Sequence, residues 1–388
     1  MSTQESFRIL FREQWVEPSG DSHGGGSVVR FDPSLMHGVM DLVVDGRPLF
    51  EHSGDDAIFF LMRDLLAAAE RLMSGESIAR VSFYETPFEL VFQRNGEKVY
   101  LTFFKGGYSP EVIVKDRLLP VRSFLSGIAD SAETLVRQTF EMDRTVGDDP
   151  LIRWMQDAVE RVKKYARRRS FKDDAPAVES TVVESSRWSA PRTADGFSFG
   201  FRLRATATDL LSPGRLSGND LHALLFRGQF VVHARERRRV MGEGYLFLQA
   251  EKMLVSLRKL LTAWEEGRPM SVRLLAEGIS IALKLSGDDS LQVTLASHTD
   301  EESIIVLNDL SPWRYADAVL GVCREIRRAI ISRSPTQRRN MRVETFARDV
   351  RQLSAMVREL RRGALINENP ERYRDELSLS TRRESAME

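Results

Sequence analysis

The chain has 388 residues, of which 42% are hydrophobic and 29% are charged, and its 56 Lys+Arg balance 56 Asp+Glu. A chain this apolar can bury a core, which excludes wholesale disorder. The single cysteine, Cys323, excludes a disulfide framework and a cysteine-ligated metal cluster. Because the sequence has no run of about 20 apolar residues and no leader-like N-terminus, we expect a cytoplasmic protein of two or three domains without a membrane segment.

The net charge of zero hides an asymmetry along the chain. Residues 1–150 hold 15 Lys+Arg and 24 Asp+Glu, a balance of −9, whereas residues 151–388 hold 41 and 32, a balance of +9. This contrast fits a polyanionic partner, docking of one half on the other, or two domains with unrelated surface charges.

The first 50 residues predict two strands, because apolar residues alternate at 7–12 and 39–44. The second strand ends at Asp45-Gly46, a dipeptide suited to a tight turn. Ser53 and Asp55 are predicted N-caps of a helix that ends near residue 73.

The next hundred residues predict four strands followed by two helices. The strands are expected at 78–83, 88–94, 98–104 and 112–115. Asn95-Gly96 predicts a hairpin between the second and the third of these strands. One helix is expected from Pro120 to about 140, and another from Pro150 to about 169, with Asp148 and Asp149 as capping residues.

The second half of the sequence echoes the first at a spacing of about 192 residues. Matched positions include Leu65 with Leu257 and Gly75 with Gly267. Such self-similarity is typical of a repeat architecture. The sequence therefore predicts an α+β fold, a tandem duplication of a β-β-α-β-β-β-β-α-α unit with mainly antiparallel sheets. The expected parts are a first repeat at 1–172, a polar linker at 173–195, a second repeat at 196–362 and a polar tail at 363–388.

The string Gly196-Phe197-Ser198-Phe199-Gly200 matches the G-x-S-x-G pattern of serine hydrolases. That pattern requires a sharp turn between a strand and a helix, with the serine at the turn. Here the alternation continues through Phe201 and Leu203, which predicts an uninterrupted strand. We therefore interpret the string as a decoy and expect no nucleophile at Ser198.

Other site signals are also weak. The six histidines include no pair four residues apart, and the paired aspartates fall at predicted caps, turns or the linker. No glycine-rich phosphate loop is present, and Cys323 lies in an amphipathic helix without a neighbouring base. We expect a protein that is not an enzyme, with no catalytic residues, no metal and no cofactor.

Two polar positions recur in the matched blocks, Arg122 with Arg314 and Asp157 with Asp349. We hypothesise a structural ion pair within each repeat, Arg122 with Asp157 and Arg314 with Asp349. The alternative is that both arginines project into a ligand groove.

Two function classes remain open. The first is a non-enzymatic interaction or scaffold protein, which binds a protein partner or a second copy of itself through two related domains. The alternative is a nucleic-acid-binding protein that uses basic helices at 161–172 and 324–362. The residues predicted to contact a polyanion are Lys163, Lys164, Tyr165, Arg167, Arg168, Arg169, Lys172, Arg327, Arg328, Arg338 and Arg339.

Overall fold

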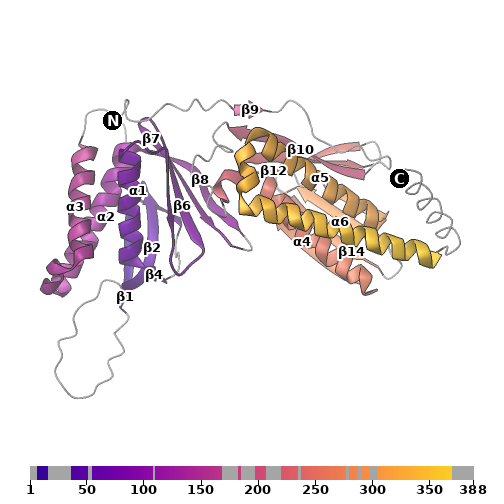
Figure 1. Ribbon diagram of the computed structural model, residues 1–388, viewed down its shortest axis with the longest axis horizontal. Helices are drawn as coiled ribbons and strands as arrows, with labels where there is room; N and C mark the ends of the chain where they lie inside the picture. The colour runs from indigo at the N-terminus through magenta and orange to yellow at the C-terminus, as the bar shows by residue number, and fades with distance from the viewer. Residues whose placement is uncertain are drawn as a thin grey trace, which may run out of the picture. The chain divides into compact units, whose positions relative to one another are not determined.

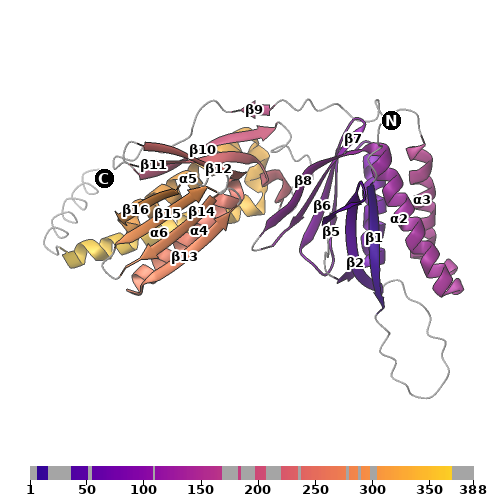
Figure 2. The ribbon, with the colours of Figure 1, turned by 180° about the vertical axis from the view of Figure 1, so that it is seen from behind.

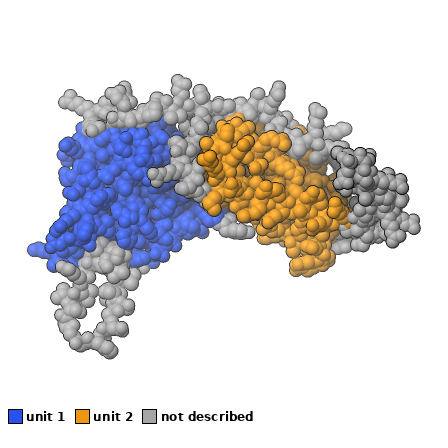
Figure 3. Space-filling view, viewed as in Figure 1, with its two compact units in different colours: residues 1–179 blue, residues 180–388 orange. Residues whose placement is uncertain are grey.

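The computed structural model describes residues 7–15, 36–50, 55–107, 110–167, 182–184, 197–206, 220–234, 237–276, 279–286, 290–297 and 304–368. The chain divides into two units, residues 1–179 and 180–388 (Figure 3). In the described residues, each unit holds three long helices and two four-stranded sheets, and the paired strands are all antiparallel. The predicted α+β class with mainly antiparallel sheets is confirmed.

Unit 1 places its helices together on one side of its sheets (Figures 1 and 2). In the first sheet β2 pairs with β1, β3 and β4, and the second sheet has the order β5-β6-β7-β8. The elements are β1 (Phe7–Trp15), β2 (Met36–Val44), β3 (Arg47–Phe50), β4 (Asp55–Ala57), α1 (Ile58–Met73), β5 (Ile78–Ser82), β6 (Phe88–Asn95), β7 (Lys98–Lys105), β8 (Glu111–Pro120), α2 (Val121–Met142), the 3₁₀ turn η2 (Arg144–Asp148) and α3 (Pro150–Ala166).

One hydrophobic cluster fills unit 1 and draws on both sheets and all three helices. Its largest members include Phe59 of α1, Phe92 of β6, Phe103 of β7 and Phe124 of α2, each fully buried. α1 packs on β5, and α2 packs on β1. The apolar positions of each helix recur at spacings of three and four residues, so one face of each helix enters the cluster.

Unit 2 has the sheet orders β12-β11-β10-β9 and β13-β14-β15-β16. Figure 2 shows the second of these sheets in front of helices α4 and α6. The elements are β9 (Val182–Glu184), β10 (Phe197–Thr206), η3 (His222–Leu224), β11 (Arg227–Ala234), β12 (Arg237–Tyr245), α4 (Leu246–Glu265), β13 (Met270–Ala276), β14 (Ile279–Leu285), β15 (Leu291–Ser297), β16 (Ile304–Leu310), α5 (Pro312–Arg333), η4 (Pro335–Arg339) and α6 (Met341–Glu368).

Several predicted turns and caps are confirmed. Asp45 and Gly46 both have positive φ, 53° and 74°, and Gly96 has a φ of 58° at the β6–β7 hairpin. The Asp149 carboxylate accepts backbone hydrogen bonds from Leu151 and Ile152, at 2.7 and 3.2 Å. It thus caps α3, and Pro150 occupies the first turn.

The predicted caps of α1 are wrong. α1 follows directly on strand β4 with Ala57 as its N-cap, and no side chain caps it. The Asp56 carboxylate instead accepts hydrogen bonds from the backbone of Ala57, Tyr84 and Glu85, which fastens the α1 entry to the end of β5. Strands β3 and β4 were not expected, since four-residue and three-residue strands are too short to show alternation.

Two predicted boundaries need correction. Strand β9 lies within the segment predicted as a linker, and it pairs with the end of β10, Val182 opposite Thr206. The β-branched pair Val182-Val183 favours this strand. Helix α6 extends to Glu368, so the first residues of the predicted tail are helical.

The long elements of unit 2 follow the order of those in unit 1, and descent from one duplicated unit stays a prediction. The helices fix the equivalent positions: α3 and α6 begin at Pro150 and Met341, which are 191 residues apart. The same spacing relates buried residues of the two helices: Ile152, Met155 and Val159 in α3 and Val343, Phe346 and Val350 in α6.

This spacing of 191 changes the matching of the recurrent polar residues. Asp157 is equivalent to Arg348, and Asp349 is equivalent to the buried Ala158. α2 and α5 begin at Val121 and Pro312, also 191 residues apart, so Arg122 is equivalent to Trp313. The matched arginines and aspartates therefore do not occupy equivalent places.

Candidate anion-binding groove

A groove of about 920 Å³ between α5, η4 and α6 is lined by five arginines. They are Arg324, Arg327, Arg328, Arg338 and Arg351, and all five are exposed. We call this site the arginine groove.

The sequence of α5 explains its arginine-bearing side. Buried residues such as Val319, Cys323 and Ile326 recur every three or four residues and face the core of unit 2. Arg324, Arg327 and Arg328 lie between them at the helical spacing that brings side chains onto one outer face. Burial of one face thus forces these three cations onto the other.

The turn η4 brings α6 back beside α5, so that the two helices run antiparallel. Two contacts between them fix this pairing. The Arg324 guanidinium donates a 2.7 Å hydrogen bond to the Ser354 hydroxyl, and Arg361 lies 3.3 Å from the Asp317 carboxylate. The turn contributes Arg338 to the groove, and α6 contributes Arg351.

The groove carries more positive charge than its neighbours neutralise. Arg328 pairs with Glu325, one helical turn away. Within the part of the chain that the structure describes, Arg327, Arg338 and Arg351 have no carboxylate within 4.0 Å. Because exposed cations that share one groove repel each other, an anion bound among them relieves this repulsion.

The lining of the groove combines cationic with apolar side chains. The apolar lining residues are Ile331, Pro335, Ala347 and Val350, and the five arginines are the charged ones. Planar guanidinium groups donate paired hydrogen bonds to phosphate or carboxylate oxygens, and they remain charged at all physiological pH values. The arrangement can therefore hold several anionic groups at once.

The structure brings together three of the four arginines predicted in this region: Arg327, Arg328 and Arg338 line the groove. Arg339 is exposed but is not a lining residue. Arg324 and Arg351 were missed as site residues. The spacing of Arg324, Arg327 and Arg328 would have identified the first, whereas Arg351 joins them only through the packing of α6 on α5.

The predicted basic segment of unit 1 is organised differently. Lys163 lies 2.8 Å from Glu133, and Tyr165 is only 6% exposed, with its hydroxyl accepting a hydrogen bond from Arg94. The Tyr165 ring is thus part of the core of unit 1 and is covered against stacking. Lys164 and Arg167 are exposed. Arg168, Arg169 and Lys172 lie outside the described residues.

Unit 1 offers an internal comparison for the arginine groove. At the spacing of 191 residues, Arg324 and Arg351 are equivalent to Glu133 and Glu160. At these two positions the corresponding helices of unit 1 therefore carry carboxylates where unit 2 carries guanidinium groups, whereas Arg328 is equivalent to Arg137. The fold does not require an arginine at the positions of Arg324 and Arg351.

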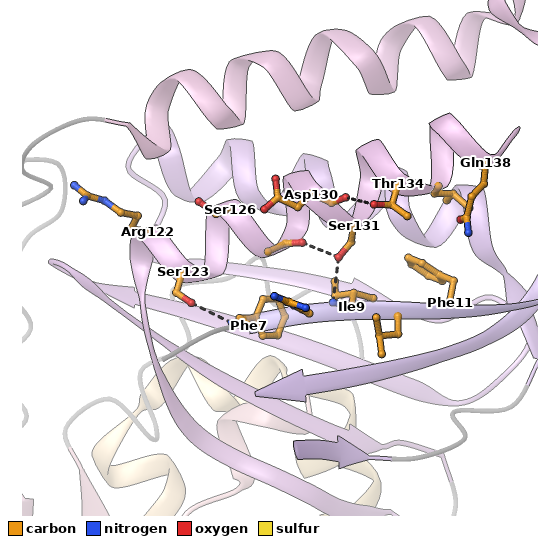
Figure 4. A pocket seen from close by; sticks show the side chains of 14 residues that line it. Phe7, Ile9, Phe11, Arg122, Ser123, Ser126, Asp130, Ser131, Thr134 and Gln138 are labelled. Carbon is orange, nitrogen blue, oxygen red and sulfur yellow. Dashed lines mark hydrogen bonds between the residues drawn. The ribbon is translucent and has the colours of Figure 1, made fainter. Parts of the chain in front are cut away.

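A second pocket, of about 670 Å³, lies between β1 and α2 in unit 1 (Figure 4). Its hydroxyls hold the strand to the helix: the backbone N–H groups of Phe7 and Ile9 donate to Ser123 and Ser131, each at 3.1 Å. Gly127 permits this close approach, since a Cβ there would collide with the Phe7 carbonyl oxygen. We assign this pocket to the joint between strand and helix rather than to a ligand.

The residues of the hypothesised ion pairs are placed as follows. Arg122 lies in the first turn of α2, and Asp157 lies in α3. Asp349 of α6 lies 3.2 Å from Arg258 of α4, a partner that the sequence did not suggest. The pairs Arg122–Asp157 and Arg314–Asp349 stay predictions, but the recurrence that motivated them does not hold.

The remaining candidate residues have structural surroundings. Ser198 lies within the continuous strand β10, where it is opposite His233 and 5% exposed. Cys323 is a buried free thiol whose pKa is raised by burial. Among the described residues no group of three or more His, Cys, Asp or Glu side chains is arranged to hold a metal ion, and no helix is long and apolar enough to cross a membrane.

Comparison with known proteins yields no match: no family model, no curated protein and no solved structure matches this chain.

Proposed function

We propose that this protein is a non-enzymatic nucleic-acid-binding protein, and that the arginine groove of unit 2 holds the phosphate backbone. The observation that carries the proposal is the convergence of five exposed arginines on one groove, two of them at positions where unit 1 has glutamates. A nucleic-acid strand presents repeated phosphates at regular spacing, which suits several guanidinium groups in a row. Ser332 supplies the hydroxyl of the groove, and the described lining residues include no carboxylate or imidazole to act as its general base.

The test measures the affinity for fluorescent, random-sequence single-stranded and duplex oligonucleotides by anisotropy. Salt is varied from about 50 to 300 mM, because contacts to phosphates release counterions. We expect the logarithm of the affinity to fall linearly with the logarithm of salt, with a slope of about −3.5 if a single strand contacts all five arginines. Absence of binding at the lowest salt concentration contradicts the proposal.

The decisive variant is the double replacement Arg327→Glu with Arg351→Glu, which reverses two charges of the groove. It should lose most of the affinity. The matched control is Arg137→Glu with Arg144→Glu, because both are exposed arginines of the corresponding α2 and η2 in unit 1. The control changes the net charge equally, so equal losses in the two variants would show that net charge rather than the groove drives binding.

A second candidate function, a scaffold that assembles with a second copy of itself, is supported by strand β16. It is the terminal strand of its sheet, and Ile304 and Val306 are 59% and 50% exposed on one face of it. An exposed apolar edge strand is a template for pairing with another chain. Light scattering should give a dimer that Ile304→Lys with Val306→Lys converts to a monomer, and a monomeric wild type contradicts this candidate.

A further inference from the structure

A pair of tryptophans lies on α4 and α5, near the end of α5 opposite to the arginine groove. Trp264 of α4 and Trp313 of α5 have ring centroids 3.5 Å apart, and both side chains are half-buried. We call these two residues the tryptophan pair. Arg361 of α6 lies 6.0 Å from the Trp313 ring centroid, within reach of a cation–π contact.

Cations connect the tryptophan pair with the groove. Arg361 is held by Asp317 at 3.3 Å, Arg358 donates to the Ser354 carbonyl at 3.3 Å, and Arg324 donates to the Ser354 hydroxyl. The Arg361 and Arg324 contacts join α5 to α6, and the Arg358 contact lies within α6 between them. The arginines therefore form a line from the groove to the tryptophans.

The length of this line can be estimated from the helix rise. Trp313 and Arg327 are 14 residues apart on α5, which corresponds to about 21 Å along the helix axis. At the spacing of 3.4 Å per nucleotide in a stacked strand, this distance matches about six nucleotides. One short single-stranded nucleic acid can thus contact both the tryptophan pair and the arginine groove.

We propose that the tryptophan pair stacks an unpaired base, so that the site prefers single-stranded over duplex nucleic acid. This inference rests on the proposed function of the arginine groove. Bases of a single strand expose their faces, whereas those of a duplex are stacked and paired. Aromatic rings and arginine planes are the surfaces on which such bases stack, independently of sequence.

The unit 1 helices lack this combination. At the spacing of 191 residues, Trp313 is equivalent to Arg122, and Arg324 is equivalent to Glu133. At these two positions the tryptophan and the arginine thus occur in unit 2 and not in unit 1. A ligand that uses both features would bind unit 2 and leave the corresponding surface of unit 1 free.

The experiment compares oligothymidylates of about 4, 8 and 12 nucleotides with a duplex of the same length. The affinity of the wild type should rise between the first two lengths and should exceed that for the duplex. Trp313→Ala should weaken single-strand binding roughly tenfold and leave duplex binding unchanged, while Trp313→Phe should retain most of the affinity. Tryptophan fluorescence should also be quenched on binding.

Trp154→Ala is the matched control, because Trp154 is a half-buried tryptophan of α3 in unit 1. It should leave single-strand binding unchanged, and circular dichroism checks that each variant is folded. If folded Trp313→Ala binds the single strand as the wild type does, while Arg327→Glu with Arg351→Glu does not, stacking is refuted and the groove stands. If the wild type binds neither single strand nor duplex, the proposed function itself fails.

Discussion

Arg342 forms a bidentate ion pair with Glu251: Nε lies 2.9 Å from Oε1, and Nη2 lies 2.8 Å from Oε2. The contact joins the first turn of α6 to α4, and both side chains are largely buried, at 10% and 23% exposed. A bidentate ion pair fixes the orientation of the two helices. It does not by itself stabilise the fold, because burial removes the hydration of both charged groups.

Arg342→Met should therefore destabilise unit 2 by about 3 kcal/mol, since it leaves the Glu251 carboxylate buried without its partner. The double replacement Glu251→Leu with Arg342→Met should recover most of that loss. Chemical denaturation of the wild type and both variants measures this difference. A double variant as unstable as the single one would mean that the ion pair itself stabilises the fold.

The same pair predicts a pH dependence. Burial raises the pKa of Glu251, and its effect outweighs the opposing influence of Arg342. A carboxyl group whose pKa is raised in the folded state favours folding while it is protonated, and this contribution is lost as pH rises through the raised pKa. The free energy of unfolding of the wild type should thus fall with rising pH above about 4.5, relative to the double apolar variant. Parallel pH profiles for the two proteins would contradict this reading.

Arg94 should be critical for unit 1. Its guanidinium is 2% exposed and donates to the Leu72 carbonyl, the Tyr165 hydroxyl and the Gly96 carbonyl, at 2.8, 3.1 and 3.2 Å. It thus joins the end of α1, the β6–β7 turn and α3. Arg94→Ala should lower the free energy of unfolding by about 3 kcal/mol, because these three partners lose their donor. Arg80→Ala, on the neighbouring strand, should cost less than about 1 kcal/mol in the same measurement, because its ion pair with Glu89 is partly exposed.

Gly127→Ala separates close packing from helix propensity. Alanine is the better helix former by about 1 kcal/mol, but its Cβ would collide with the Phe7 carbonyl oxygen. We expect a net loss of about 2 to 3 kcal/mol as β1 is pushed away from α2. Gly46→Ala is the comparison: its Cβ would meet nothing within 4 Å, so only the positive φ of 74° opposes it, at a cost of about 1 kcal/mol. A Gly127→Ala protein more stable than the wild type would disprove the close approach.

Adjacent arginines test the boundary of the groove. Arg338 is a lining residue and Arg339 is not, although both are exposed in η4. Arg338→Ala should reduce the magnitude of the salt slope of single-strand binding by about 0.7, the contribution of one phosphate contact, and Arg339→Ala should leave it unchanged. Equal effects of the two replacements would place the bound strand elsewhere on η4.

Local signals predicted much of the fold. The Asp149 cap, the Asn95-Gly96 hairpin and the Asp45-Gly46 turn depend on side chains and dihedral angles within a few residues, so they could be recognised in the sequence. The start of α1 could not be recognised in this way. The Asp56 carboxylate accepts hydrogen bonds from the backbone N–H groups of residues 84 and 85, which follow the helix by more than ten residues. Matching the halves at 192 residues shifted the helix positions by one, since differences in loop length between the two units alter the spacing along the chain.

The residues of the candidate site could be predicted from the sequence only in part, for a similar reason. Clusters of arginine in the sequence indicated a basic region, and Arg327, Arg328 and Arg338 were identified from it. Which arginines share one groove depends on how η4 turns the chain and how α6 packs on α5. The tryptophan pair combines residues 49 positions apart, and periodicity within one element cannot predict such a contact.

The caps of α3 and α6 imply different assembly histories for the two units. Asp149 caps α3 through neighbours only, so that the start of this helix can be completed as soon as its own residues are available. Asn340 accepts from the Arg342 backbone N–H, but its amide also donates to the Asp220 carbonyl, 120 residues earlier in the chain. This bond closes a long loop, whose entropy must be overcome before the contact can form. The last helix of unit 2 should therefore lock into place late, after the strands that follow Asp220 have assembled.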